Sequence, residues 1–319
     1  MAARTDVLVV GAGVSGLTTG VCLAEQGFRV RIRTARGPRR STSAAAGAIW
    51  DPFYAEHPKT PRWSAYSYKV FAELDGRYGV RMTEGTEASR DAVEPPDWTW
   101  GLPGFRECRP AELPANFTCG WRYTAPVIDM ARYLPYLLGR FRRAGGKLEY
   151  GRLRRLDEGF ATASVVVNCA GAAARELVPD PGVIPRRGQL VLVRNPGFTD
   201  FFVEESRDQA EMTYLLPQGA VLVLGGSAIT ALPGPADRRA QRRVATGIRK
   251  RCIDVFPELA KAPVLGRRVG VRPARHEVRL DVESRGSRHI VHNYGHAGAG
   301  VSLSWGCSAD VTELVQALV

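Results

Sequence analysis

Three closely spaced glycines near the start of the chain constrain its fold more than any other feature. The run DVLVVGAGVSGLTTGVCLAEQGFRVRI predicts a buried strand over Val7–Val10, a tight turn, an amphipathic helix ending near Gly27 and then a second strand. The turn holds Gly11, Gly13 and Gly16, which have the GxGxxG spacing. A strand, a glycine turn and a helix in this order are typical of a doubly wound, Rossmann-like α/β domain.

Each glycine of this turn has a physical purpose. The first lets the chain turn, the second removes the Cβ that would block a pyrophosphate, and the third lets helix and strand pack closely. The free N–H groups at the start of the helix, around Val14 and Ser15, then point at the phosphates. The segment therefore predicts that the chain binds a dinucleotide.

Three further segments favour a flat cofactor. Ser41–Ala48 consists of small residues, which indicates backbone lying against something flat. Ser164–Cys169 predicts another buried strand of a parallel sheet, and it leads into Ala170 and Gly171. Late in the chain, His292–Gly306 (HNYGHAGAGVSLSWG) is a glycine-rich turn opening an apolar helix, which has little purpose unless a ligand sits on it.

The remaining segments predict a second domain interleaved with the first. The stretches GQLVLVRN, EMTYLLPQG and AVLVLGG alternate with short turns and predict an antiparallel sheet. Other patterns predict helices over Pro61–Gly79, Asp129–Gly145 and Ala236–Phe256, and extended chain over Leu265–Leu280. We expect the dinucleotide domain in residues 1–60, 125–185 and 265–319, and the substrate domain in residues 61–124 and 186–264.

Composition excludes several other classes. The formal charge is +12, but 39 of the 44 basic residues are arginines scattered along the chain without a nucleic-acid-binding motif, so no nucleic-acid partner is expected. The six cysteines lack metal-ligand or CxxC spacing, which predicts neither a metal site nor disulfides. No signal pattern and no apolar run of ~20 residues is present, so we expect a cytoplasmic protein without a membrane partner. A homodimer is an option that the sequence leaves open.

Seven ordered motifs resemble the D-amino-acid oxidase family. They are VVGAGVSGL, TSAAAGAIWDP, VVNCAG, RRGQLVLV, TYLLP, VGVRPARHEVRLD and HNYGHAGAGVSLSWGC. The resemblance implies FAD as cofactor and oxidative deamination of D-amino acids to 2-oxo acids and ammonia. Hydride would pass from Cα to flavin N5, and dioxygen would then be reduced to hydrogen peroxide.

The resemblance also assigns cofactor contacts. Arg36, Thr42 and Ser43 match positions that hold the ADP and pyrophosphate part, and Ala46, Gly47, Ala48 and Ile49 match positions along the flavin. Leu153 matches a position near adenosine, and Ala170 with Gly171 would lie beneath the pyrophosphate or ribityl chain. The late turn would offer backbone N–H groups to the flavin pyrimidine carbonyl from Ala297, Gly298, Gly300, Val301 and Ser302, beside a helix start that stabilises negative charge.

The substrate contacts implied by the resemblance are few. Arg272 would grip the amino acid carboxylate through a bidentate fork and lie beside the cofactor, and the hydroxyl of Tyr214 would join that contact. The carbonyl of Gly298 would hold the amine. The expected chemistry needs no side-chain base, so His292 and His296 are interpreted as structural.

The chain departs from the family pattern at three places. Ala35 stands where an acidic residue would hold the adenosine ribose, and the neighbouring Arg36 is also compatible with a 2′-phosphate and NADP, although the other motifs favour a flavin. Ala210 stands where a lid tyrosine is expected, and Arg207 resembles an arginine that meets a side-chain carboxylate. Asp51 instead replaces a neutral amide, which would favour an ammonium or a basic side chain.

Two alternatives stay open at this point. A related amine oxidase could act on glycine, a secondary amine or an acidic D-amino acid. A non-catalytic flavin-binding protein would keep the scaffold, although it would have no use for a carboxylate clamp made by Arg272 and Tyr214.

Overall fold

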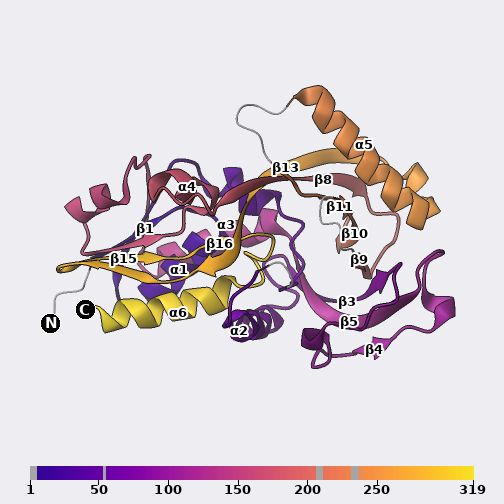
Figure 1. Ribbon diagram of the computed structural model, residues 1–319, viewed down its shortest axis with the longest axis horizontal. Helices are drawn as coiled ribbons and strands as arrows, with labels where there is room; N and C mark the ends of the chain where they lie inside the picture. The colour runs from indigo at the N-terminus through magenta and orange to yellow at the C-terminus, as the bar shows by residue number, and fades with distance from the viewer. Residues whose placement is uncertain (1–5, 53–54, 206–210, 231–236) are drawn as a thin grey trace.

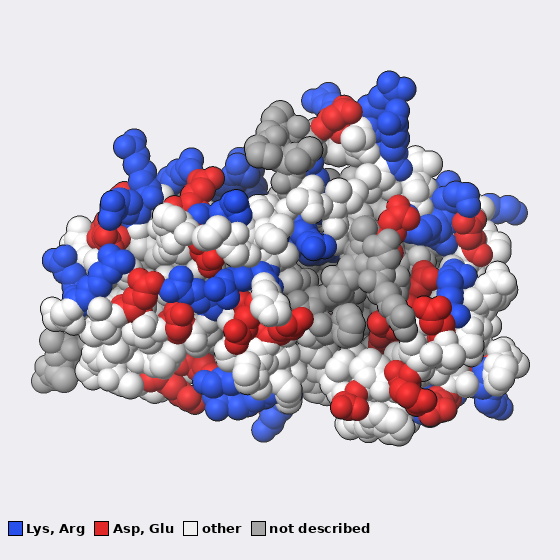
Figure 2. Space-filling view, in the orientation of Figure 1, with Lys and Arg blue, Asp and Glu red and all other residues white. Residues whose placement is uncertain are grey.

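The computed structural model describes residues 6–52, 55–205, 211–230 and 237–319. Within these ranges the chain forms a six-stranded and a ten-stranded sheet that lie end to end, as Figure 1 shows. None of the helices in the described ranges has the length and hydropathy that a bilayer crossing requires. Basic and acidic side chains are interspersed over the face drawn in Figure 2.

The six-stranded sheet has the order β14-β15-β7-β1-β2-β6. Its central strands are parallel, and only β14 runs antiparallel to its neighbour β15. The prediction of a doubly wound parallel sheet is therefore confirmed. The strands are β1 (Asp6–Val10), β2 (Arg29–Thr34), β6 (Lys147–Tyr150), β7 (Val165–Asn168), β14 (Val282–Arg285) and β15 (Arg288–His292).

Both faces of this sheet are covered, which explains the unbroken apolar run of its first strand. Val7 and Val9 pack into the core beneath the helices, whereas Leu8 and Val10 face a second cluster around Leu156. On the first face, α1 (Val14–Glu25) packs against α3 (Met130–Arg143) and α6 (Ser304–Ala317). The short α4 (Ala174–Leu177) and the 3-10 helix η5 (Leu156–Ala161) follow β7 and β6 in the chain.

The ten-stranded sheet has the order β16-β13-β8-β11-β10-β9-β3-β5-β4, with β12 paired to β8. Its pairs are antiparallel except for β3 with β9, which are parallel. The prediction of antiparallel strands therefore holds for most of the sheet. The strands are β3 (Val80–Ser89), β4 (Arg106–Glu107), β5 (Cys119–Ile128), β8 (Ile184–Arg194), β9 (Phe201–Glu205), β10 (Glu211–Gln218), β11 (Val221–Ser227), β12 (Ile229–Thr230), β13 (Val264–Arg279) and β16 (Tyr294–His296).

The basic helix α5 (Arg238–Val255) lies over β8, β10 and β11, at the top of Figure 1. On this helix the side chains of Ile248 and Cys252 are buried, whereas Arg238, Arg239 and Arg242 are exposed. The arginines of this helix therefore lie mainly on its solvent-exposed face.

Sheet membership differs from the sequence-based division of the chain. The division placed the end of β5, from residue 125, and nearly all of β13, from residue 265, in the dinucleotide domain, but both strands belong to the ten-stranded sheet. β13 pairs with β8 over most of its length and reaches β16 at its far end, so in Figure 1 it runs from one half of the molecule into the other. β13 thus stays within the ten-stranded sheet, and the chain that leaves it enters β14 of the six-stranded sheet.

The helix predicted over Pro61–Gly79 is shorter in the structure. α2 (Thr60–Glu73) ends before a turn in which Gly76, Tyr78 and Gly79 have positive φ values of 71°, 55° and 88°. A left-handed conformation cannot continue a right-handed helix, so the apolar periodicity overestimated its length. The predicted helix over Asp129–Gly145 is confirmed as α3, whose first turn is capped by Asp129.

Close packing of α6 on α2 generates the first prediction. A Cβ added at Gly306 would lie 2.3 Å from the Cα of Trp63, whereas one at Gly247 on α5 meets nothing nearer than 3.5 Å. We expect Gly306→Ala to lower the free energy of unfolding by about 1–3 kcal/mol through overpacking. Gly247→Ala should raise it by about 0.5–1 kcal/mol through helix propensity. Urea unfolding of both variants checks this, and equal effects would contradict the close contact.

Candidate functional site

A cavity of about 900 Å³ lies at the carboxyl ends of β1, β2 and β7. Ligands of open α/β sheets bind at this edge, and the volume is near the upper end of the ~300–1,000 Å³ range of ligand sites. Its wall is continuous from the end of β2, past the first glycine turn, to the late turn between β16 and α6. A long, narrow ligand fits such a wall better than a compact one.

The first glycine turn is held by contacts that exclude side chains. Gly11 has φ +108°, and a Cβ there would lie 2.4 Å from the carbonyl oxygen of Cys169. A Cβ at Gly16 would lie 2.0 Å from the oxygen of Gly11, so Gly16 packs the helix onto the turn and does not line the cavity. Gly13 is the N-cap of α1 and does line it. The N-terminus of a twelve-residue helix therefore faces the cavity.

The small-residue segment is anchored by hydrogen bonds from other elements. Its 3-10 helix η2 (Thr42–Ala45) is tied to β13 by the Thr42 hydroxyl, which donates to the carbonyl of Val271 at 2.9 Å. The Ser43 hydroxyl accepts from the Val14 N–H at 2.9 Å, so it caps α1 as well as facing the cavity. The Gln218 amide donates to the Gly47 carbonyl at 2.9 Å. The backbone that would lie along a flat ring is therefore held by hydrogen bonds within the protein.

Two residues predicted along the flavin lie behind the wall. Ala46 and Gly47 line the cavity, but Ala48 and Ile49 do not. The carbonyl of Ala48 accepts from Ile128, and Ile49 bridges to Val127 of β5. The chain turns away at Ala48, whose φ is 60°, because these bonds draw it onto the second sheet.

The late turn offers fewer free donors than expected. The N–H of Ala297 donates to the Pro273 carbonyl at 3.2 Å, so it is already used. The Ser302 hydroxyl accepts from the Asp51 N–H at 2.9 Å, and Ser302 lies outside the cavity lining. Gly300 and Val301 line the cavity, and no described acceptor takes their N–H groups. These two donors could receive a ring carbonyl.

Arg272 of β13 and Tyr214 of β10 lie close together, although β8 and β11 separate their strands in the sheet. Arg272 lines the cavity and donates to the Ser227 carbonyl at 2.6 Å. A Cβ at Gly188 would lie 2.7 Å from the Arg272 guanidinium, so Arg272 fits there because Gly188 has no side chain. Tyr214 rests on Gly225, where a Cβ would lie 1.9 Å from its ring. Burial raises the pKa of Tyr214, and the Arg272 guanidinium offsets only part of this increase. The Tyr214 hydroxyl therefore stays protonated and can donate a hydrogen bond.

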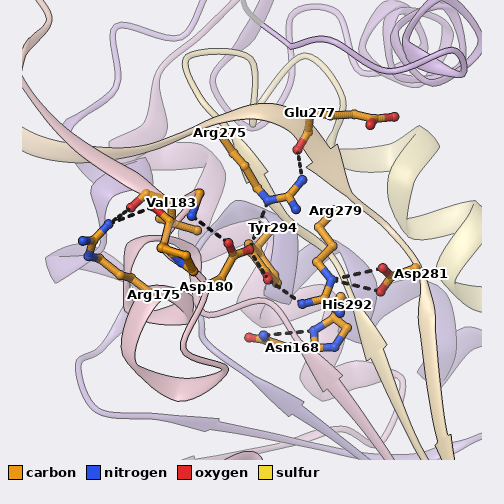
Figure 3. A network of polar contacts seen from close by, with 12 residues as sticks. Asn168, Arg175, Asp180, Val183, Arg275, Glu277, Arg279, Asp281, His292 and Tyr294 are labelled. Atoms are coloured by element: carbon orange, nitrogen blue, oxygen red, sulfur yellow. Dashed lines mark hydrogen bonds and ion pairs between the residues drawn. The ribbon is translucent and has the colours of Figure 1, made fainter.

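A polar network beside the cavity fixes β13 against β16, as Figure 3 shows. Asp180 accepts from the Tyr294 hydroxyl at 2.7 Å and from Arg275 at 3.0 Å. Arg279, further along β13, donates to the same tyrosine at 3.0 Å. Because Pro273 and Ala297 lie at the cavity end of these strands, the network sets the distance between Arg272 and the late turn.

Both histidines near the late turn are buried, in agreement with their structural interpretation. Burial lowers the pKa of His296 to about 4 and also lowers the pKa of His292, so both are neutral at pH 7. The ring of His292 contacts the amide of Asn168 at 3.2 Å. Among the residues that the structure describes, no cluster of His, Cys, Asp or Glu could hold a metal ion.

Most of the predicted residues line the cavity. These are Gly11, Gly13, Val14, Ser15, Arg36, Thr42, Ser43, Ala46, Gly47, Leu153, Ala170, Gly171, Arg272, Ala297, Gly298, Gly300 and Val301. Arg207 and Ala210 lie outside the described residues. Sequence reasoning assigned no role to Gly188, Gln218 and Asp180, because each acts by placing another residue.

The helix start, the small-residue wall and the unpaired N–H groups of the late turn together define a dinucleotide-binding protein whose site accepts a flat ring system. The comparisons extend this class to a family. Residues 6–314 match the family model described as FAD dependent oxidoreductase, so the chain belongs to this DAO family and binds FAD.

Several known proteins are similar over nearly the whole chain. A D-amino-acid oxidase of Rubrobacter xylanophilus is 44% identical over 315 residues, covering 97% of this chain and 95% of that protein. One of Streptomyces coelicolor is 44% identical over 318 residues, covering 97% and 96%. The crystal structure of glycine oxidase from Geobacillus kaustophilus superposes with a TM-score of 0.80 at 19% identity, covering 98% of this chain and 95% of that one. The last comparison supports the fold alone.

The Asp180 network generates the second prediction. Burial favours a higher pKa for Asp180, but hydrogen bonds from Tyr294, Arg275 and the Gly182 N–H outweigh it and hold the pKa below its usual value. A depressed pKa adds stability that is complete above the unfolded pKa of ~3.9 and is lost as pH falls through the folded pKa.

We therefore expect Asp180→Asn to lower the free energy of unfolding by about 1–3 kcal/mol at pH 7. The deficit should shrink as pH falls from the unfolded pKa of ~3.9 through the lower pKa of the folded carboxylate, where the folded wild type also takes up the proton. Urea unfolding with excess FAD across this pH range measures it. Asp254→Asn, in an exposed pair with Lys250, is the control and should cost less than about 0.5 kcal/mol. A pH-independent deficit would contradict the role of the charge.

Proposed function

We propose that this protein is an oxidase that deaminates D-amino acids to 2-oxo acids and ammonia, with dioxygen reduced to hydrogen peroxide. The observation that carries the proposal is a single arginine, Arg272, seated over Gly188 at the end of the FAD cavity with the protonated hydroxyl of Tyr214 beside it. Similarity to relatives named D-amino-acid oxidase over nearly the full chain supports it.

Arg272 is the proposed carboxylate anchor. One of its nitrogens already donates to the Ser227 carbonyl, which holds the guanidinium plane in place and leaves other N–H groups for a substrate. A guanidinium matches a carboxylate through two parallel hydrogen bonds, which fixes direction as well as position. The Tyr214 hydroxyl would add a third donor to the same carboxylate.

The Gly298 carbonyl is the proposed partner of the amine. It lies in the late turn, which the β13–β16 pairing holds next to Pro273 and thus one residue from Arg272. With the carboxylate and the amine both fixed, only one hand of amino acid directs its Cα–H bond toward the cavity wall.

Bound FAD supplies a two-electron acceptor for the hydride that leaves Cα. The protein's own contribution is to position the substrate, since no described histidine at the site is charged at pH 7 and the anchors are an arginine, a hydroxyl and a carbonyl. The free N–H groups of Gly300 and Val301, next to the start of α6, would favour negative charge on a ring placed against them.

Carboxyl groups near Asp51 bear on the side chain of the substrate. Glu87 is fully buried and accepts from the Tyr123 hydroxyl at 2.7 Å. Burial, together with the nearby Asp51 and Glu205, raises its pKa well above the usual value. Asp51, whose negative charge contributes to this shift, is the group that a substrate carboxylate beside it would meet as like charge, so we propose that neutral or basic D-amino acids are preferred over acidic ones.

The proposed cellular location is the cytoplasm. All six cysteines are free, and three of them are fully buried as small apolar side chains. A reducing compartment suits such a set.

The direct test is anaerobic mixing of the purified, FAD-containing protein with D- and L-amino acids whose side chains are neutral, acidic or basic. Oxidised flavins absorb at about 450 nm. We expect this absorbance to be lost with D-amino acids only. The rate should be lowest for acidic side chains. If no D- or L-amino acid bleaches the flavin but glycine or a secondary amine does, the related amine oxidase would be favoured instead.

Arg272→Met separates substrate binding from cofactor binding. Loss of a charge-assisted pair should reduce kcat/KM by about 30-fold or more, equivalent to about 2 kcal/mol or more, while FAD content stays near wild type. Arg267→Met changes an exposed arginine on the same strand and is the matched control, expected to leave kcat/KM within about twofold. An unchanged kcat/KM in Arg272→Met would remove Arg272 as the anchor.

A further inference from the structure

The adenosine end of the FAD cavity has an excess of positive charge. Five arginines line it: Arg33, Arg36, Arg40, Arg152 and Arg154. The single carboxylate among its lining residues is Glu176, which pairs with Arg152 at 3.1 Å. Ala35 leaves a gap where a ribose-binding acid would stand. Five positive groups against one negative group leave a surplus of four positive charges.

FAD itself neutralises only part of this surplus. Its pyrophosphate carries one negative charge on each of its two phosphates, and its ribose offers neutral hydroxyls. Two positive charges therefore stay unbalanced at the ribose when FAD is bound. A phosphate monoester or free phosphate carries about two negative charges near neutral pH, which matches that excess.

Four of these arginines have no carboxylate within 4.0 Å among the described residues, namely Arg33, Arg36, Arg40 and Arg154. Many other arginines of this chain form such pairs, including Arg29, Arg122 and Arg140. These four arginines therefore line the cavity wall without a carboxylate partner among the described residues.

Arg33 is the most enclosed of the four unpaired arginines. Its guanidinium lies against Gly151, where a Cβ would be 2.9 Å from Nε, so the loop after β6 leaves room for it beside the cavity. The Nε itself is buried without an acceptor in the part of the chain that the structure describes, so an anion in the cavity would be met by the terminal nitrogens of this side chain.

We propose that this end of the cavity is an anion subsite that takes a phosphate group beside the adenosine ribose. An adenine nucleotide phosphorylated on its ribose then binds in preference to its unphosphorylated parent. Arg33 donates from below, and the exposed Arg36, Arg40 and Arg154 close around the anion. The inference depends on the FAD cavity and not on the proposed oxidation of D-amino acids.

The test measures nucleotide binding to the full chain after removal of flavin, using preparations that regain bound FAD when it is added back. Adenosine 5′-monophosphate and adenosine 2′,5′-bisphosphate compete with FAD, and binding is followed by flavin fluorescence. We expect the bisphosphate to compete on the order of tenfold more tightly. Equal competition by the two nucleotides overturns the proposal.

Variants distinguish a built subsite from general charge. Arg33→Met and Arg36→Met should each remove most of the preference for the bisphosphate. Arg39→Met is the matched control, because Arg39 is exposed between Arg36 and Arg40 in the chain but does not line the cavity. A preference that all three variants weaken equally overturns the proposal. Arg36 is exposed, so its variant stays informative if Arg33→Met fails to fold.

Two further arms identify the source of the anion. Adenosine 3′,5′-bisphosphate tests whether the position of the phosphate on the ribose matters. Inorganic phosphate at constant ionic strength should raise the affinity for adenosine 5′-monophosphate if the free anion occupies the same subsite. If Arg33→Met loses both the dependence on the ribose phosphate and the effect of inorganic phosphate, a common subsite is supported. If both survive in Arg33→Met, the assignment to Arg33 is overturned.

Discussion

The site depends on one long strand, β13, which other segments hold in place on both sides of Arg272. β13 pairs with β8 over most of its length. The carbonyl of Val271 accepts a hydrogen bond from the Thr42 hydroxyl, and the carbonyl of Pro273 accepts one from the Ala297 N–H, next to β16. Arg272 stands between these last two contacts. Its position relative to the cofactor wall is therefore set by backbone hydrogen bonds on both sides, which are more rigid than any loop. Displacement of β13 would move the anchor and the late turn together.

The sequence was most informative where a local conformation demands particular residue types. Gly11 adopts a positive φ and touches Cys169, so no other residue fits, and the strand, turn and helix around it were predicted within two residues of their bounds at most positions. β7 and the late helix α6 were found for similar reasons, since apolar runs and glycines mark them. These features are readable because they depend on neighbours in the chain.

Contacts between distant segments could not be read in this way. The Ser302 hydroxyl bonds the Asp51 N–H across 251 residues, and the Ala297 N–H is taken by Pro273, so residues expected to face the flavin are used by the protein itself. The end of α2 was missed because its apolar spacing continues through a left-handed turn. Periodicity reports which side of an element is apolar and says little about where other segments cross it.

The anchoring of the small-residue segment has a consequence for how the cofactor is acquired. Ser43 caps α1, and the Gln218 amide donates to the carbonyls of Gly47 and Ile128 at 2.9 and 3.0 Å. Because these hydrogen bonds are internal to the protein, the segment has little backbone freedom to lose when FAD binds. The affinity for FAD should then depend on contacts along the cavity wall more than on the ordering of this segment.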